Sequence, residues 1–120
     1  MAHLALHFLL PLLIARTFYR DDWRFVLIIL IATMVVDVDH LLADPIYDPS
    51  RCSIGFHPLH RLPAIAVYAG LFLIPLALRR TTRRGKAALA GAPRVVHLIG
   101  LGLLVHMALD YSDCWPWFPT

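Results

Sequence analysis

Four apolar stretches occupy most of this 120-residue chain and restrict what it can fold into. They cover about residues 3–18, 25–43, 62–78 and 95–111, and each is slightly shorter than the ~20 residues that a perpendicular membrane-spanning helix needs. Hydrophobic residues make up 59% of the chain, well above the share in a soluble domain. Buried helices of a soluble protein are the alternative, but four of them would leave almost no polar surface.

The predicted fold class is therefore all-α: an integral membrane, antiparallel four-helix bundle with a folded loop between its second and third helices. The chain contains no internal repeat and no low-complexity tract, so residues 1–120 form one predicted domain. The long connection at residues 44–61 is rich in proline and aspartate, which predicts irregular structure. Because this loop also carries apolar residues and histidines, we expect it to fold over a site.

Basic residues are concentrated in the first and third connections between these stretches. Those connections hold nine of the eleven, and only Arg51 and Arg61 lie in the second connection. Cytoplasmic loops carry the excess of lysine and arginine, so both termini and the loop at 44–61 are predicted to face the periplasm of a bacterial inner membrane. The formal net charge of +3 reflects this topology and does not indicate nucleic-acid binding. The nine residues are Arg16, Arg20, Arg24, Arg79, Arg80, Arg83, Arg84, Lys86 and Arg94.

Ionisable side chains gather at the predicted periplasmic level. Six of the seven histidines and six of the eight acidic residues fall there, and His97 is the histidine that does not. Ionisable groups in or at a membrane are costly and usually functional, so we interpret the cluster as a metal site. The predicted metal ligands are His3, His7, Asp37, Asp39, His40, His57, His60, His106 and Asp110.

Two of the ligand pairs have the i and i+4 spacing that places side chains on one face of a helix. His3 and His7 form one pair, and His106 and Asp110 form the other. Because both pairs lie at the same predicted level, together they favour a shared cation more than either does alone. A mixture of imidazole and carboxylate suits zinc better than calcium or magnesium. We therefore expect one or two divalent metal ions, with zinc as the favoured element.

The second stretch ends in VVDVDH, which carries three ionisable residues in close succession. On a regular helix Asp37 and His40 share a face, and Asp39 turns away unless the helix loosens there. Asp37 or Asp39 could take a proton from a metal-activated water, while Arg61 either binds an anionic substrate or contacts lipid headgroups. Asp37 and Arg61 are accordingly the predicted catalytic residues. The strongest ligand candidates are His7, Asp39, His60, His106 and Asp110.

The two cysteines lie on the same predicted side of the membrane. Cys52 is in the outer loop and Cys114 directly follows the fourth stretch. An oxidising periplasm would allow a disulfide between them, but sequence does not show whether they are close enough. A disulfide and two separate thiols are both consistent with the sequence.

The ordered motifs VVDVDH, HPLH and HMALD resemble a small family of membrane-bound, metal-dependent hydrolases. CSIGFHPLHRLPAIAVY and HLALHFLLPLLIA look especially similar to a four-helix bacterial domain of unknown function. That family is grouped distantly with zinc-dependent phospholipase C and single-strand nucleases, whose clustered zinc ions are held by histidine and aspartate. The resemblance implies that His106 and Asp110 match their H-x-x-x-D pair, and that Asp39 and His60 match further ligands. This chain departs from those enzymes in being much shorter, in containing no glutamate and in lacking their second histidine–acid helix pair, unless His3 and His7 take its place. These departures favour one or two ions over three.

These observations predict a membrane-embedded, metal-dependent hydrolase acting on a phosphoester bond in a lipid or lipid-linked substrate. The alternative is a non-catalytic, metal-stabilised accessory subunit of a larger membrane protein complex. Bis-histidine haem binding is disfavoured because the cluster is rich in carboxylates. Ion transport is disfavoured because the charges lie at one end of the helices rather than along their depth.

Overall fold

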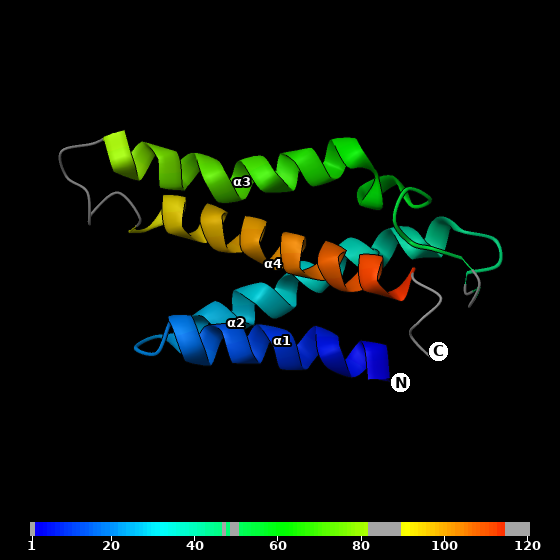
Figure 1. Cartoon of the computed structure of the whole chain (residues 1–120), viewed down its shortest axis with the longest axis horizontal. Helices are drawn as coiled ribbons and strands as arrows, with labels where there is room; N and C mark the ends of the chain where they lie inside the picture. Colours follow the sequence, from blue (N-terminus) through cyan, green and yellow to red (C-terminus); the bar gives the residue numbers. More distant parts are fainter. Residues whose placement is uncertain (1, 47, 49–50, 82–89, 115–120) are drawn as a thin grey trace.

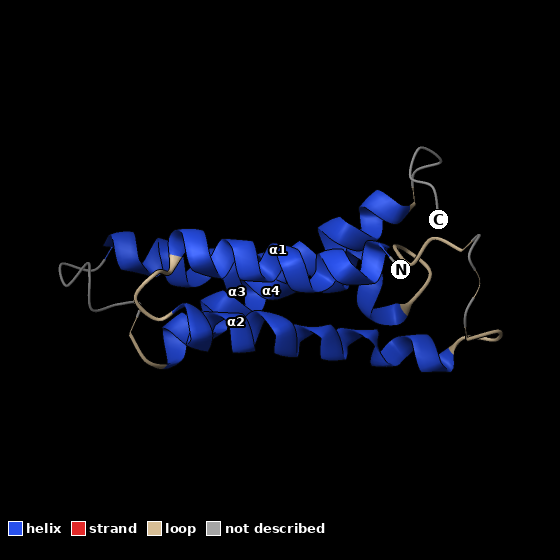
Figure 2. Ribbon diagram, turned by 90° about the horizontal axis from the view of Figure 1, so that it is seen from below, coloured by secondary structure: helices blue, strands red, loops and turns tan. Residues whose placement is uncertain are grey.

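The computed structural model describes residues 2–46, 48, 51–81 and 90–114, and over these residues the chain is all-α with no strand (Figures 1 and 2). The predicted basic residues Arg83, Arg84 and Lys86 lie outside the described residues. Over the described residues, four α-helices and two 3₁₀ helices follow one another. They are α1 (Ala2–Phe18), α2 (Trp23–Ala32), η1 (Thr33–Leu42), η2 (Pro58–His60), α3 (Leu62–Thr81) and α4 (Ala92–Asp113).

The second apolar stretch is not one continuous α-helix. It changes at Thr33 from the α-helix α2 to the 3₁₀ helix η1, and the Thr33 hydroxyl donates a hydrogen bond to the Leu30 carbonyl at 2.6 Å. A 3₁₀ helix has three residues per turn, so every third side chain lies on the same line. Thr33, Val36 and Asp39 follow this line and are all buried. Tighter winding, rather than the loosening considered from sequence, therefore turns Asp39 toward the interior.

α4 lies at the centre of the bundle and contacts α1, α2 and α3 (Figure 1). Two glycines allow the closest approaches. A Cβ atom at Gly100 would lie 2.7 Å from the Leu71 carbonyl carbon of α3, and one at Gly102 would lie 2.8 Å from Thr33 Cγ2. Small residues of this kind let membrane helices approach one another closely.

Two apolar clusters stabilise the two halves of the bundle. The inner cluster joins α1, α2 and α4, and the outer cluster joins η1, α3 and α4. The inner cluster therefore lies toward the basic connections and the outer cluster toward the loop at 44–61. The inner cluster is Ala15, Val26, Leu30 and Leu98, and the outer cluster is Val36, Tyr68, Leu103 and Met107.

Three helical segments are long and apolar enough to cross a membrane: Trp23–Leu42, Leu62–Arg80 and Ala92–Ser112. The fourth, His3–Phe18, is apolar but shorter, so the four helices are confirmed and three of them meet the length for spanning. Large hydrophobic side chains are exposed on these segments, including Val35 at 73%. Exposed apolar surface of this kind marks a membrane or partner surface, and the three helices together indicate a multi-pass membrane protein.

Candidate metal centre

The structure brings all nine predicted metal-ligating side chains together at one end of the bundle. They form three groups, and within each group the candidate ligand atoms lie within 4.8 Å of one another. The helices alternate in direction, so the start of α1, the end of η1, the loop before α3 and the end of α4 meet there (Figure 1). The central group is Asp37, His60, His106 and Asp110; the second is His3, His7 and Asp110; the third is Asp39, His40 and His57.

The central group has the spacing expected around one small cation. Asp37 Oδ1 lies 2.9 Å from His106 Nε2 and 3.5 Å from His60 Nε2. Asp110 Oδ2 lies 3.0 Å from His60 Nε2 and 3.3 Å from His106 Nε2. Four ligand atoms placed tetrahedrally at about 2.0–2.1 Å from an ion are about 3.3–3.4 Å apart. The four separations bracket this value, so the group could hold a divalent ion of this size.

Several buried atoms of the site have no hydrogen-bond partner in the described part of the chain. They include His7 Nε2, His60 Nε2 and Asp110 Oδ2. His60 Nε2 and Asp110 Oδ2 are only 3.0 Å apart, yet their geometry is not that of a hydrogen bond. Leaving a buried polar group unpaired costs about 1–3 kcal/mol, and more for a charged one. A cation in the central group would satisfy His60 Nε2 and Asp110 Oδ2, and one in the second group would satisfy His7 Nε2.

Asp110 connects the central group to the second group. Its Oδ2 faces the central group, whereas its Oδ1 lies 3.3 Å from His3 Nε2 and 3.2 Å from His7 Nε2. The Nδ1 atom of His7 donates a hydrogen bond to the His3 carbonyl oxygen at 3.1 Å, which leaves Nε2 free to act as a ligand. Because its two oxygens face different histidine sets, Asp110 could bridge two ions.

Asp39 lies behind His60 rather than in the central group. Its Oδ2 accepts a hydrogen bond from the Leu59 backbone N–H at 2.7 Å and another from His60 Nδ1 at 3.3 Å. Carboxylates hydrogen-bonded to a ligand histidine in this way fix its orientation and direct the other ring nitrogen to the metal. The structure thus places Asp37 in the central group and Asp39 in position to orient His60.

The third group has a geometry less suited to a shared ion. The rings of His40 and His57 are stacked, with centroids 3.8 Å apart and planes inclined by 24°. Imidazole lone pairs lie in the ring plane, so two nearly parallel rings do not aim them at one point. Burial, followed by the electrostatic effect of the neighbouring His40 imidazole, lowers the pKa of His57. Sequence reasoning missed Ser53, whose hydroxyl lies 3.1 Å from His40 Nε2; the only signal was its place in the histidine-bearing loop.

His60 is the most enclosed member of the central group, with a side chain that is 0% exposed. Burial opposes its charge, but the negative carboxylates of Asp110, Asp37 and Asp39 beside it outweigh burial and raise its pKa to about 10. The same carboxylates that hold a proton on His60 would attract a cation in its place. Metal binding would therefore displace that proton.

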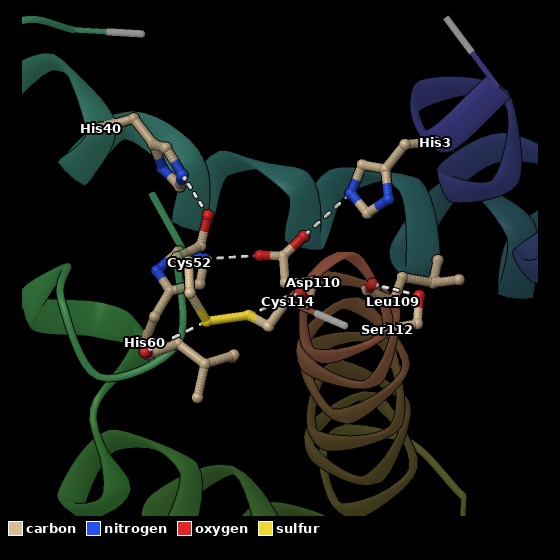
Figure 3. The surroundings of a disulfide bond; sticks show 10 residues. His3, His40, Cys52, His60, Leu109, Asp110, Ser112 and Cys114 are labelled. Carbon is tan, nitrogen blue, oxygen red and sulfur yellow. Dashed lines mark hydrogen bonds and ion pairs between the residues drawn. A yellow bond between two sulfur atoms is a disulfide. The ribbon is translucent and has the colours of Figure 1, made fainter. Parts of the chain in front are cut away.

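A disulfide between Cys52 and Cys114 ties the outer loop to the end of α4 (Figure 3). The Cα atoms are 4.9 Å apart, and Cys114 Sγ lies 3.3 Å from the Asp110 carbonyl oxygen. The question left open by the sequence is thus answered in favour of the disulfide. By closing a separation of 62 residues, the bond fixes the ligand-bearing loop against the helix that carries Asp110.

Two further predicted positions lie outside the ligand groups. Arg61, predicted to be catalytic, is exposed and donates a hydrogen bond to the Phe56 carbonyl oxygen at 3.4 Å, so its predicted role stays a prediction. His97, which we placed away from the cluster, is buried and donates a hydrogen bond to the Phe72 carbonyl oxygen at 2.9 Å. That bond joins α4 to α3 and gives His97 a structural role.

Comparison with known proteins identifies the family of this chain. No curated protein and no solved structure matches it. One family model matches residues 1–85, which include the first histidine pair, VVDVDH and HPLH, whereas His106 and Asp110 lie beyond the matched range. The match spans more than half of the chain, so this protein belongs to the family of unknown function DUF6122.

Proposed function

We propose that this protein is a membrane-embedded, metal-dependent hydrolase that uses one or two divalent ions, with zinc as the favoured element. The observation that carries this proposal is the central group, in which two imidazoles and two carboxylates are spaced for one ion. Several of its buried atoms have no other partner among the described residues. A mixture of histidine and aspartate ligands is typical of zinc and its neighbours.

Differences in exposure within the central group indicate where water and substrate would enter. The side chains of His60, His106 and Asp110 are 0%, 3% and 7% exposed, whereas that of Asp37 is 41% exposed. Catalytic zinc sites have three protein ligands and a fourth position for water. His60, His106 and Asp110 would be the three ligands, and Asp37 would lie beside the open position.

The chemistry then follows from what each side chain can do. A divalent ion held here would supply a nucleophile, because divalent ions such as zinc can lower the pKa of bound water to about 7. Asp37 would accept the proton of that water, since its carboxylate reaches both the ligand atoms and solvent. Asp39 would keep His60 aimed at the ion, and Asp110 would connect the central group to the histidine pair on α1.

A lipid or lipid-linked phosphoester is the substrate class that suits these surroundings. The centre lies at one end of the apolar helices, and Leu42, Ile46 and Leu62 beside it are 59–79% exposed. Such residues suit the level where lipid chains meet headgroups. Arg61 is exposed on the same loop and would bind the phosphate. The basic connections at the other end of the bundle favour a periplasmic site in a bacterial inner membrane.

A non-catalytic accessory subunit of a larger membrane complex is the second candidate. The enclosure of His60, His106 and Asp110 favours it, because closed coordination is typical of structural metal sites. In that case Asp37 would complete the coordination, and the ion would stabilise the outer half of the bundle without turnover.

A pair of matched variants tests the proposal. His106 and His97 are both buried histidines of α4, but only His106 belongs to the central group. In protein reconstituted with zinc in lipid nanodiscs, we expect His106→Gln to lower the zinc content and to slow phospholipid headgroup release at least about 100-fold. His97→Gln should retain both. Full activity and full zinc content in His106→Gln would refute the proposed centre, whereas stoichiometric zinc without hydrolysis would favour the accessory subunit.

A further inference from the structure

A serine, a histidine and an aspartate line up beside the central group. His40 Nε2 lies 3.1 Å from Ser53 Oγ, and His40 Nδ1 lies 3.2 Å from Asp39 Oδ1. Asp37 Oδ1 is a second carboxylate oxygen on the Nδ1 side, at 3.6 Å. The two ring nitrogens of His40 thus face a hydroxyl on one side and carboxylates on the other.

The hydrogen-bonding capacity of these groups fixes where the hydrogens lie. A carboxylate only accepts hydrogen bonds, so His40 Nδ1 must donate to Asp39. In the neutral imidazole Nε2 then carries the lone pair, and the Ser53 hydroxyl donates to it. This is the polarity that activates a serine nucleophile in serine hydrolases.

Ser53 and Asp39, which lie on either side of His40, are each held in place by further bonds. The Ser53 carbonyl accepts hydrogen bonds from the N–H groups of Phe56 and His57 at 3.2 and 3.3 Å, and its neighbour Cys52 is linked to α4. Asp39 is buried, with its second oxygen bonded to the Leu59 N–H. The nucleophile, the base and the carboxylate are therefore positioned by the folded loop and η1 before any ligand arrives.

The exposure of His40 and Ser53, and the apolar residues of the same loop, indicate the kind of substrate. The His40 side chain is 27% exposed and Ser53 is partly exposed, so the pair lies near the surface of the folded loop. Phe56 and Leu59 of the same loop are 49% and 38% exposed, and the Phe56 ring contacts His57 edge-on at 5.0 Å. An apolar rim beside a serine nucleophile suits an acyl chain.

We propose that Ser53, His40 and Asp39 form a second, metal-independent catalytic site that hydrolyses carboxylic esters of membrane lipids. Ser53 Oγ attacks the carbonyl carbon, its proton moves to His40 Nε2, and that proton leaves with the alcohol as the ester C–O bond breaks. Water then attacks the acyl-serine carbon and gives a proton to His40 Nε2. The acyl–Oγ bond breaks, the fatty acid leaves, and the proton returns to Ser53 Oγ. The sum is ester plus water giving acid plus alcohol.

An alkyl fluorophosphonate, which forms a stable adduct with activated serines, tests the site without requiring a known substrate. In nanodisc-embedded protein we expect mass spectrometry to locate one adduct on Ser53, which Ser53→Ala abolishes. Ser112→Ala is the matched control, because the Ser112 hydroxyl only donates to the Leu109 carbonyl of its own helix. His40→Gln should slow labelling at least about 100-fold while the Cys52–Cys114 disulfide and the elution volume are retained.

The outcomes separate this site from the proposed metal centre. Labelling of Ser53 should remain detectable and dependent on His40 in chelator-treated protein and in the His106→Gln variant, even though loss of the ion loosens η1. Absence of an adduct on Ser53, or equal labelling rates in the native protein and His40→Gln, would overturn the proposal. Either result would leave metal-dependent hydrolysis untouched.

Discussion

Both halves of the bundle contain an apolar cluster, but buried histidines and aspartates are concentrated in the outer half. Leu30 and Leu98 in the inner half are 2% and 0% exposed, and His60 and Asp110 in the outer half are 0% and 6% exposed. Apolar side chains are satisfied by packing alone, whereas buried imidazoles and carboxylates require partners. The inner half can therefore fold on apolar packing alone, whereas the outer half also buries imidazoles and carboxylates that a bound cation could partner.

The largest expected effect is that of removing metal, which should destabilise the outer half of the bundle and leave the stability of the inner half unchanged. An ion present at a thousand times its dissociation constant stabilises the folded state by about 4 kcal/mol, which chelation would remove. We expect chelated protein to exchange amide hydrogens faster in η1, η2 and the first turns of α1. The inner ends of α2 and α4 should be unchanged by hydrogen-exchange mass spectrometry. Equal acceleration in both halves would contradict the comparison.

Replacing Asp39 tests whether the outer half depends on the groups behind the ligands. Asp39→Asn keeps the size of the side chain but removes the charge that orients His60. Changes to such supporting partners typically weaken metal affinity 10–100-fold, or about 1.4–2.7 kcal/mol. Competition with a fluorescent zinc chelator measures the change, with Asp21→Asn at the inner connection as the control. An unchanged affinity in Asp39→Asn would mean that His60 is oriented by other contacts.

The helices and the position of the candidate ligands could be predicted from the sequence, whereas the local structure of the outer half could not. The four helices, the end at which the ligands meet and the ligand residue types follow from apolar length, alternation of direction and the i, i+4 pairs. The 3₁₀ winding of η1 does not follow, because nothing in TMVVDVDH distinguishes it from α-helix; packing of Val36 and Asp39 against distant elements decides it. The roles of Asp37 and Asp39 depend on that winding. Ser53 was missed for the same reason, since its contact with His40 exists only after the loop folds.

The stability of the metal-free protein should fall as pH rises, whereas that of the zinc-loaded protein should stay nearly constant. The folded-state pKa of His60, about 10, exceeds its unfolded value of about 6.5. In metal-free protein this stabilisation is fully present below pH 6.5 and is lost as pH rises toward 10, at about 1.4 kcal/mol per pH unit. Zinc requires the unprotonated ring, so the stabilisation by zinc should increase over the same range. Thermal melts between pH 7 and 9 would show this divergence, and parallel curves would exclude His60 as a ligand.

The smallest effect is expected from the ion pair at the inner end. Arg94 donates a hydrogen bond to Asp22, but the two side chains are 32% and 36% exposed, so water competes for both. Pairs of this kind contribute about 0–1 kcal/mol. Asp22→Asn should therefore change the melting temperature slightly and leave zinc affinity as it was, because the inner apolar cluster continues to hold α2 against α4. A tenfold loss of zinc affinity in Asp22→Asn would show instead that the two halves are energetically coupled along α4.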